Sequence, residues 1–360
     1  MGFLQRASSC VRPPATVAAF AALLMVQTAP AAAPSASPAT CRFPDSEVSW
    51  LQRALDGWDQ VSREFLATEP AELPWIVLFD GSCVWHLAGE APTWIQAQPI
   101  ATDLTFRGAA VPVRAQTHDG TLFLPSGAPM SVEMKASTSL YRNGRAAFFV
   151  MAMPSVWQTR DVSAPTRAEF LQGVFSHEMT HIRLIVPISR LVNDLVRKND
   201  LAYPINDDQI QRDFQRVHGF AAAFSRERDL FYRAALDPDP GRRRELTRAA
   251  LKLVRDRHAR FFTGANAAYA EIESLFLTME GVGQWAAYRL NKARAGGNEG
   301  EALRLVRENK RYWSQDEGLA LFLLIDALVP GWQSRIFTDS PASPFTLLQE
   351  AVDRPSRPLP

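Results

Sequence analysis

The sequence predicts an α+β fold, with a β-rich N-terminal lobe over residues 41–163 and a mostly α-helical lobe over residues 164–354. Two observations predict it. Short apolar runs separated by Gly-containing turns fill the first part of the chain, which is typical of strands. After Pro187, apolar residues recur at three- and four-residue spacing almost to the end, which is typical of helices.

Residues 1–31 are interpreted as a signal peptide. Arg6 and Arg12 precede a short apolar run, and Ala29-Pro30-Ala31 has the A-x-A pattern of a cleavage site. Because the run is too short to span a bilayer, we expect export to the periplasm or the extracellular space, without stable membrane insertion after cleavage. An uncleaved N-terminal anchor is the alternative.

The charge balance of the remaining chain is close to neutral. The signal removes two of the 39 basic residues and none of the 38 acidic ones, so the sequence favours no nucleic-acid partner. The locally basic segment 242–260 is interpreted as a solvated helix face, with a binding patch as the alternative. Residues 32–40 and 355–360 are expected to form a disordered linker and a loose tail.

Cys41 and Cys83 are the cysteines that follow the signal. An exported protein with two cysteines is expected to join them in a disulfide. Two free, buried thiols are the alternative.

The β-rich lobe is expected to begin with a helix over residues 45–67, where apolar residues have helical spacing. Trp75 to Phe79 is predicted to form a buried strand, with Val84 to Leu87 as its partner. Two Gly-containing pairs predict β-hairpins. The first is Asp119-Gly120 between strands 111–117 and 121–124, and the second is Asn143-Gly144 between strands 137–142 and 145–153.

The segment Thr166 to Val186 is predicted to be a helix. Thr166 and Glu169 have capping-box spacing, and Pro187 is expected to end or kink the helix. Gly173 costs about 1 kcal/mol at a helix interior relative to Ala, which indicates close packing there. Further helices are expected at 188–198, 206–235, 241–261, 264–292, 300–312, 315–328 and 344–352.

The predicted helix contains the pattern H-E-x-x-H at His177, Glu178 and His181. Residues four apart share a helix face, so both imidazoles point the same way, as the ligands of a zinc ion (Zn2+) do. Glu178 lies one step round the helix, which suits a general base. Two satisfied core histidines are the alternative.

A catalytic zinc site usually has a third protein ligand. Leu184 and Pro187 occupy positions where a metzincin has Gly and His, which excludes that family. We therefore expect a carboxylate from a later helix, which contains Glu271, Glu273 and Glu280. Glu280 is preferred because the small residues near it would let its helix approach the histidines closely; a surface carboxylate is the alternative. Glu273 lies about 10 Å away along the axis, so both cannot bind one ion.

The segment Glu280 to Tyr288, EGVGQWAAY, resembles the glutamate segment of gluzincin metallopeptidases. Together with His177, Glu178 and His181 it resembles a gluzincin zinc site. The resemblance implies a zincin-like fold and zinc-dependent hydrolysis of a peptide or protein substrate, with Glu178 as the proton carrier.

The resemblance also implies an edge strand that pairs with extended substrate and a donor that stabilises the oxyanion. Residues 146–152 are expected to be that strand. Four residues could be the donor, namely Tyr288, Tyr312, His218 and His258. Two alternative functions stay open: a non-catalytic binding or scaffold protein with a structural zinc clasp, and a zinc hydrolase of a non-peptide amide.

Overall fold

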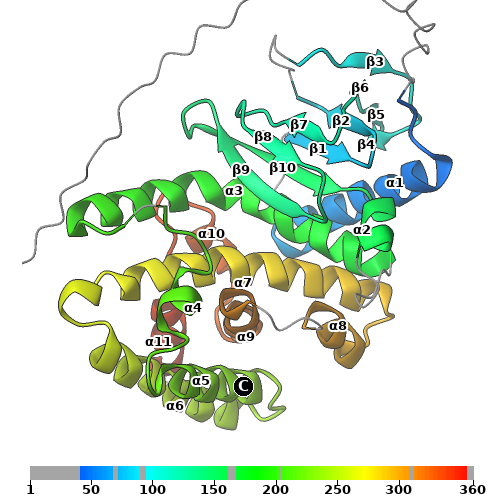
Figure 1. The fold of residues 1–360 in the computed structure, drawn as a ribbon. Coiled ribbons are helices and arrows are strands. Elements are labelled where there is room, and N and C mark those ends of the chain that lie inside the picture. The colour runs from blue at the N-terminus through cyan, green and yellow to red at the C-terminus, as the bar shows by residue number, and fades with distance from the viewer. Residues whose placement is uncertain are drawn as a thin grey trace, which may run out of the picture. The chain divides into compact units, whose positions relative to one another are not determined.

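The computed structural model describes residues 41–67, 72–89, 95–160, 168–202, 204–307 and 312–354. The predicted signal peptide, linker and tail lie outside these residues. The described part contains a β-sheet region followed by a helical region, in agreement with the α+β prediction (Figure 1). None of the described helices is both long enough and apolar enough to span a membrane.

A mixed six-stranded sheet forms the centre of the N-terminal region. Its strand order is β3-β6-β2-β1-β10-β9, with β1 and β10 parallel and the other neighbours antiparallel. The strands are β1 (Trp75–Phe79), β2 (Cys83–Leu87), β3 (Gln98–Ile100), β6 (Val113–Thr117), β9 (Ala136–Tyr141) and β10 (Ala146–Ala152). The predicted pairing of the first two apolar runs is therefore confirmed.

β1 is apolar along its whole length because both faces of the sheet are covered. Ile76 and Leu78 belong to the main core, which extends through α1 (Asp45–Gln60) into the helical region. Val77 and Phe79 face a second cluster, which includes Leu122. Two short pairs of strands complete the region: β4 (Thr105–Phe106) with β5 (Ala109–Ala110), and β7 (Thr121–Phe123) with β8 (Pro129–Ser131).

One predicted hairpin is confirmed and the other is wrong. β9 and β10 pair around Asn143-Gly144, and both turn residues have positive φ, which this turn requires. Asp119-Gly120 instead connects two sheets, because β6 pairs with β2 and β3 while β7 pairs with β8. The turn was identified correctly, but the burial of Leu122 against Met130 decides the partner of β7.

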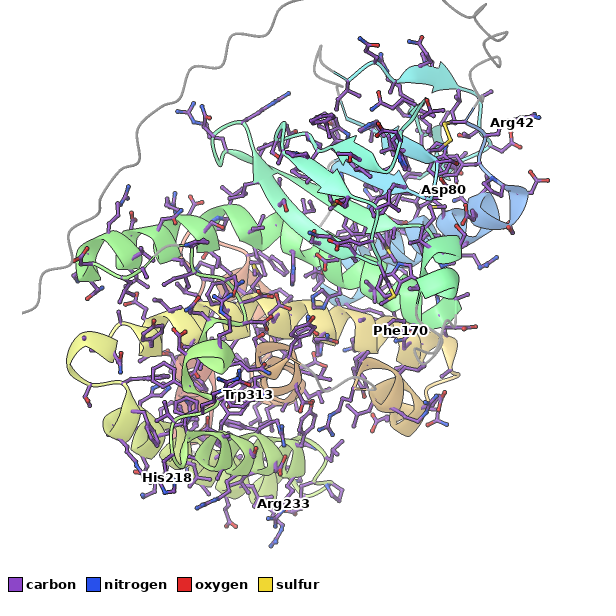
Figure 2. The ribbon with its side chains drawn as sticks, viewed as in Figure 1. Arg42, Asp80, Phe170, His218, Arg233 and Trp313 are labelled. Carbon is purple, nitrogen blue, oxygen red and sulfur yellow. A yellow bond between two sulfur atoms is a disulfide. The ribbon has the colours of Figure 1, made fainter. Side chains whose placement is uncertain are left out.

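The predicted N-terminal helix is confirmed as far as Phe65, since a π-helical turn over Val61–Phe65 extends α1. The prediction missed α2 (Pro154–Arg160), which follows β10 directly. The predicted disulfide between Cys41 and Cys83 is confirmed, with the two Cα atoms 5.8 Å apart, and Figure 2 shows it near Arg42.

The helix that carries the H-E-x-x-H pattern is α3 (Ala168–Asn199), and it passes through Pro187 without ending. The prediction that the helix ends near Val186 was therefore wrong, and residues 188–198 belong to the same helix. Proline removes one backbone hydrogen bond, but Leu184 and Ile188 on either side are buried in the main core, and this packing keeps the two halves in one helix. Thr166 of the predicted capping box lies outside the described residues.

The remaining helices follow the predicted order with two exceptions. The predicted helix 206–235 is divided at Gly219, where φ is +82°, and the short helix Gln333–Ile336 was not predicted. They are α4 (Gln209–Phe214), α5 (Phe220–Ala235), α6 (Pro240–Phe261), α7 (Tyr269–Arg294), α8 (Glu299–Val306), α9 (Trp313–Leu328), α10 (Gln333–Ile336) and α11 (Pro344–Asp353). α3 packs against β9 and β10 on one side and along α7 on the other (Figure 1). The pattern helix therefore lies between the sheet and the helical region.

Candidate metal centre

His177 and His181 lie on the face of α3 that packs against α7. Both are 5% exposed, and their ring centroids are 4.3 Å apart. The helical spacing alone accounts for this proximity, because residues four apart are neighbours on one face.

Glu280 reaches the two histidines from α7. Its Oε2 lies 3.3 Å from Nε2 of His177, and its Oε1 lies 3.6 Å from Nε2 of His181. The three residues each offer a ligand atom, these atoms lie within 4.8 Å of one another, and all three side chains are buried. This group could therefore bind a metal ion.

Glycines permit the close approach of α7 to α3. A Cβ added at Gly283 would lie 2.8 Å from Nδ1 of His177 and 2.9 Å from Nε2 of His181. On α3, a Cβ at Gly173 would lie 3.2 Å from the side chain of Asn291. The close packing predicted at Gly173 and at the small residues near Glu280 is confirmed. Gly281 serves a different contact, since a Cβ there would lie 2.6 Å from the carbonyl oxygen of Gly318 in α9.

The protonation and bonding of these residues fit metal ligands. Nδ1 of His177, Nε2 of His181 and Oε2 of Glu280 are buried without a hydrogen-bond partner. Burial lowers the pKa of His177, against the charges of Glu178 and Asp207, which favours the neutral imidazole that binds metals. Burial raises the pKa of Glu280 to about 8, although the charge of His181 opposes this. A cation next to Glu280 would remove the cost of its buried charge.

Glu178 is held beside the two histidines by the sheet. The hydroxyl of Thr138, on β9, lies 2.8 Å from the backbone oxygen of Glu178 and 3.0 Å from its Oε2, and can donate to either. Burial by itself would raise the pKa of Glu178, but the hydrogen bond and charge of His181, the charge of His177 and the hydrogen bond of Thr138 together lower it. Glu178 is therefore kept ionised, as a general base requires. Thr138 could not be predicted from the sequence, because no spacing rule relates it to α3.

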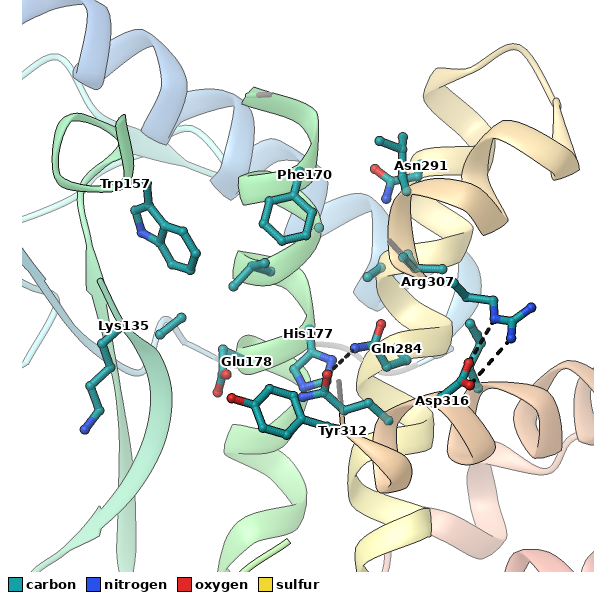
Figure 3. A pocket seen from close by; sticks show the side chains of 18 of the residues that line it. Lys135, Trp157, Phe170, His177, Glu178, Gln284, Asn291, Arg307, Tyr312 and Asp316 are labelled. Carbon is teal, nitrogen blue, oxygen red and sulfur yellow. Dashed lines mark hydrogen bonds and ion pairs between the residues drawn. The ribbon is translucent and has the colours of Figure 1, made fainter. Parts of the chain in front are cut away.

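A cleft of about 670 Å³ opens at His177 and Glu178 (Figure 3). Its walls come from β9, α2, α3, α7, α8 and α9. The lining residues include Lys135, Trp157, Phe170, Val174, Gln284, Ala287, Asn291, Leu305, Arg307, Tyr312, Gln315, Asp316 and Leu319. A substrate could therefore enter beside the candidate metal ligands.

The two other candidate ligands lie elsewhere. Glu271 is exposed. Glu273 accepts two hydrogen bonds of 2.9 Å from Arg257, and its Oε2 lies 2.7 Å from Nε2 of His258. Arg257 is 2% exposed, so the interpretation of segment 242–260 as a solvated face was wrong at this residue, because its charge is paired inside the protein.

Of the four candidate donors for an oxyanion, Tyr312 lies in the cleft, and Figure 3 shows it pointing toward the side of Glu178. Tyr288 and His258 line no part of that cleft, and His218 is exposed on the loop before α5. The prediction that residues 146–152 form an edge strand was wrong, because β10 lies between β1 and β9. β9 takes the edge position and provides the start of the cleft wall at Ala136.

Comparison of the chain with protein-family models, with curated proteins and with solved structures found no match.

Proposed function

We propose that the protein is an exported, zinc-dependent metallopeptidase with a zincin-like core. One observation carries the proposal: Glu280, which is 99 positions beyond His181, lies against both histidines of the H-E-x-x-H helix, with Glu178 beside them at the cleft. A gluzincin zinc site, which the sequence resembles, combines two histidines and one distant glutamate as ligands with a second carboxylate that does not bind the metal.

The residues of the chain divide the work of peptide hydrolysis among them. A zinc ion held by His177, His181 and Glu280 would supply a Lewis acid and lower the pKa of a coordinated water toward 7. Glu178 would accept the proton and deliver it to the leaving amine. Thr138 orients Glu178 through its hydroxyl. Tyr312 is proposed to donate a hydrogen bond to the developing oxyanion.

The edge strand β9 is proposed to bind the substrate backbone. An extended peptide can add to an exposed sheet edge through main-chain hydrogen bonds. β9 carries Thr138 next to Glu178, and its first residue, Ala136, lines the cleft. A peptide paired with β9 would therefore pass the general base.

Export is part of the proposal. The signal-like segment 1–31 and the disulfide between Cys41 and Cys83 support it, because disulfides persist in oxidising compartments.

The test of the proposed function is the substitution Glu178→Gln in the mature protein. Gln keeps the size and shape of the side chain but removes its basic oxygen, so hydrolysis of a peptide library should fall by a factor on the order of 10² to 10⁴. The zinc content, measured by elemental analysis, should stay at about one ion per chain. Glu280→Gln is the matched variant, because it should lose the metal as well as the activity.

Two results would contradict the proposal. If Glu178→Gln hydrolyses the library at the wild-type rate, Glu178 is not the general base. If the wild-type protein holds zinc but cleaves no peptide, the structural clasp or the hydrolase of another amide replaces the peptidase.

A further inference from the structure

One end of the cleft, beyond His177, is apolar. Its walls there come from Phe170 and Val174 of α3, Ala287 of α7 and Leu305 of α8. The ring of Phe170 also makes an edge contact with Trp157, with centroids 6.4 Å apart. Such a surface favours the side chain of an apolar or aromatic residue over a charged one.

Asn291 interrupts this apolar end with an amide. It is 3% exposed and lines the cleft, and its Oδ1 has no hydrogen-bond partner. Figure 3 shows it at the same end of the cleft as Phe170. A buried polar atom without a partner is unfavourable, so a ligand that forms a hydrogen bond to this amide would gain affinity.

Two other polar side chains of the described cleft, Arg307 and Gln284, already have partners. Arg307 pairs with Asp316 at 2.9 Å and stacks over Tyr232 at 3.7 Å. The amide of Gln284 donates to Gln315 at 3.0 Å. Lys135 also lines the cleft, but Figure 3 shows it at the opposite end from Asn291. Asn291 is therefore the polar contact at the apolar end.

The position of Asn291 sets the length of the side chain that it can recognise. It packs against Gly173, which precedes His177 by one helical turn, a rise of about 5–6 Å along α3. A short side chain that branches near its Cα would not reach from the scissile bond to Asn291. A para-substituted ring is long and rigid enough to span it.

We infer that this end of the cleft binds a tyrosine side chain of the substrate next to the scissile bond, with the phenolic hydroxyl on Asn291 and the ring against Phe170. A phenol both donates and accepts, so it can pair with either end of the amide. The inference rests on the proposed peptidase function and names its substrate class.

The experiment compares peptides that differ only by Tyr or Phe at the positions that flank the cleavage site, which mass spectrometry of the products identifies. At one flanking position, kcat/KM should be about tenfold to a hundredfold higher for Tyr, because Phe leaves the amide unpaired. Asn291→Leu should bring the Tyr/Phe ratio close to one. Val174→Ala is the matched control, since it changes the volume of the same wall and should alter both peptides equally.

A binding measurement separates this inference from the proposed function. Calorimetric titration of the Glu178→Gln protein, which should cleave the same peptides only slowly, should show the same preference for Tyr in binding. Cleavage by the wild-type protein with equal rates for Tyr and Phe would overturn the tyrosine pocket and leave the peptidase standing. Preferential binding of Tyr peptides without wild-type cleavage would retain the pocket and overturn the peptidase.

Discussion

Glu273 and Glu280 lie two turns apart on α7 and both are buried, but their side chains have different partners. Glu273 is held by the guanidinium of Arg257 and the imidazole of His258. Burial by itself would raise its pKa, but Arg257 and His258 lower it. Glu280 faces His177 and His181, and burial raises its pKa to about 8.

The difference between the partners of Glu273 and Glu280 distinguishes a structural carboxylate from a candidate metal ligand. A buried carboxylate is costly unless a cation and hydrogen bonds compensate it. The fold provides Glu273 with its own cation, so Glu273 joins α7 to α6. The described side chains around Glu280 include no Lys or Arg paired with it, and its Oε2 has no hydrogen-bond partner. Burial and residue type are alike at the two positions, and the partner distinguishes them.

The largest expected effect tests the structural side of this comparison. Arg257→Met removes the cation that Glu273 and Glu227 share, and it should lower the free energy of unfolding by about 3–5 kcal/mol, as is usual when one partner of a buried ion pair is lost. Urea unfolding measures this. Glu280→Gln in metal-free protein is the matched case and should cost much less. If Arg257→Met is as stable as the wild type, Glu273 is not a structural carboxylate that depends on Arg257, and the proposed difference from Glu280 is wrong.

The second prediction uses the two glycines of α7 beside Glu280. Gly283→Ala places a Cβ against both imidazoles, so metal affinity should fall by about 10- to 100-fold, the usual effect of disturbing the surroundings of metal ligands. Competition with a chromophoric chelator measures the affinity. Gly281→Ala is the control: its Cβ meets Gly318 in α9, so it should lower stability by about 1–3 kcal/mol. If Gly281→Ala reduces metal affinity and Gly283→Ala does not, the predicted metal site is contradicted.

The third prediction concerns Glu317, which forms one buried group with Arg257, Glu227 and Glu273, the Arg257 cluster. Both of its carboxylate oxygens are buried without a hydrogen-bond partner. Burial, followed by the charge of Glu227, raises its pKa well above the ordinary value. The folded state therefore binds a proton more tightly than the unfolded state, and stability is lost as pH rises above the unfolded pKa of about 4.5.

Glu317→Gln should make the stability less dependent on pH. One such group contributes a slope of at most about 1.4 kcal/mol per pH unit. Urea unfolding of both proteins between pH 5 and about 8 measures the slope. A variant with the wild-type slope would show that Glu317 titrates alike in the folded and unfolded states. Glu317 would then be excluded as a proton-binding group of the Arg257 cluster.

The elements that the sequence predicted well are those with a strong local signal. The Asn143-Gly144 hairpin, the apolar strand at Trp75 to Phe79 and the helix predicted at 241–261 were all recognisable. The errors arose where packing overrides a local rule. Buried neighbours keep α3 helical through Pro187. The burial of Leu122 in the second cluster pairs β7 with β8 and not with β6.

For the candidate site, the sequence by itself determined that His177, Glu178 and His181 lie together, because a helix of 3.6 residues per turn brings residues four apart onto one face. It also narrowed the third ligand to one helix. Only the tertiary structure decided that Glu280 meets the histidines while Glu273 pairs with Arg257 and that β9 is the edge strand. It also decided that Thr138 bonds to Glu178 and that Tyr312 and Asn291 lie at the cleft. These contacts join residues tens of positions apart, and the periodicity of apolar residues carries no information about which distant faces will pack together.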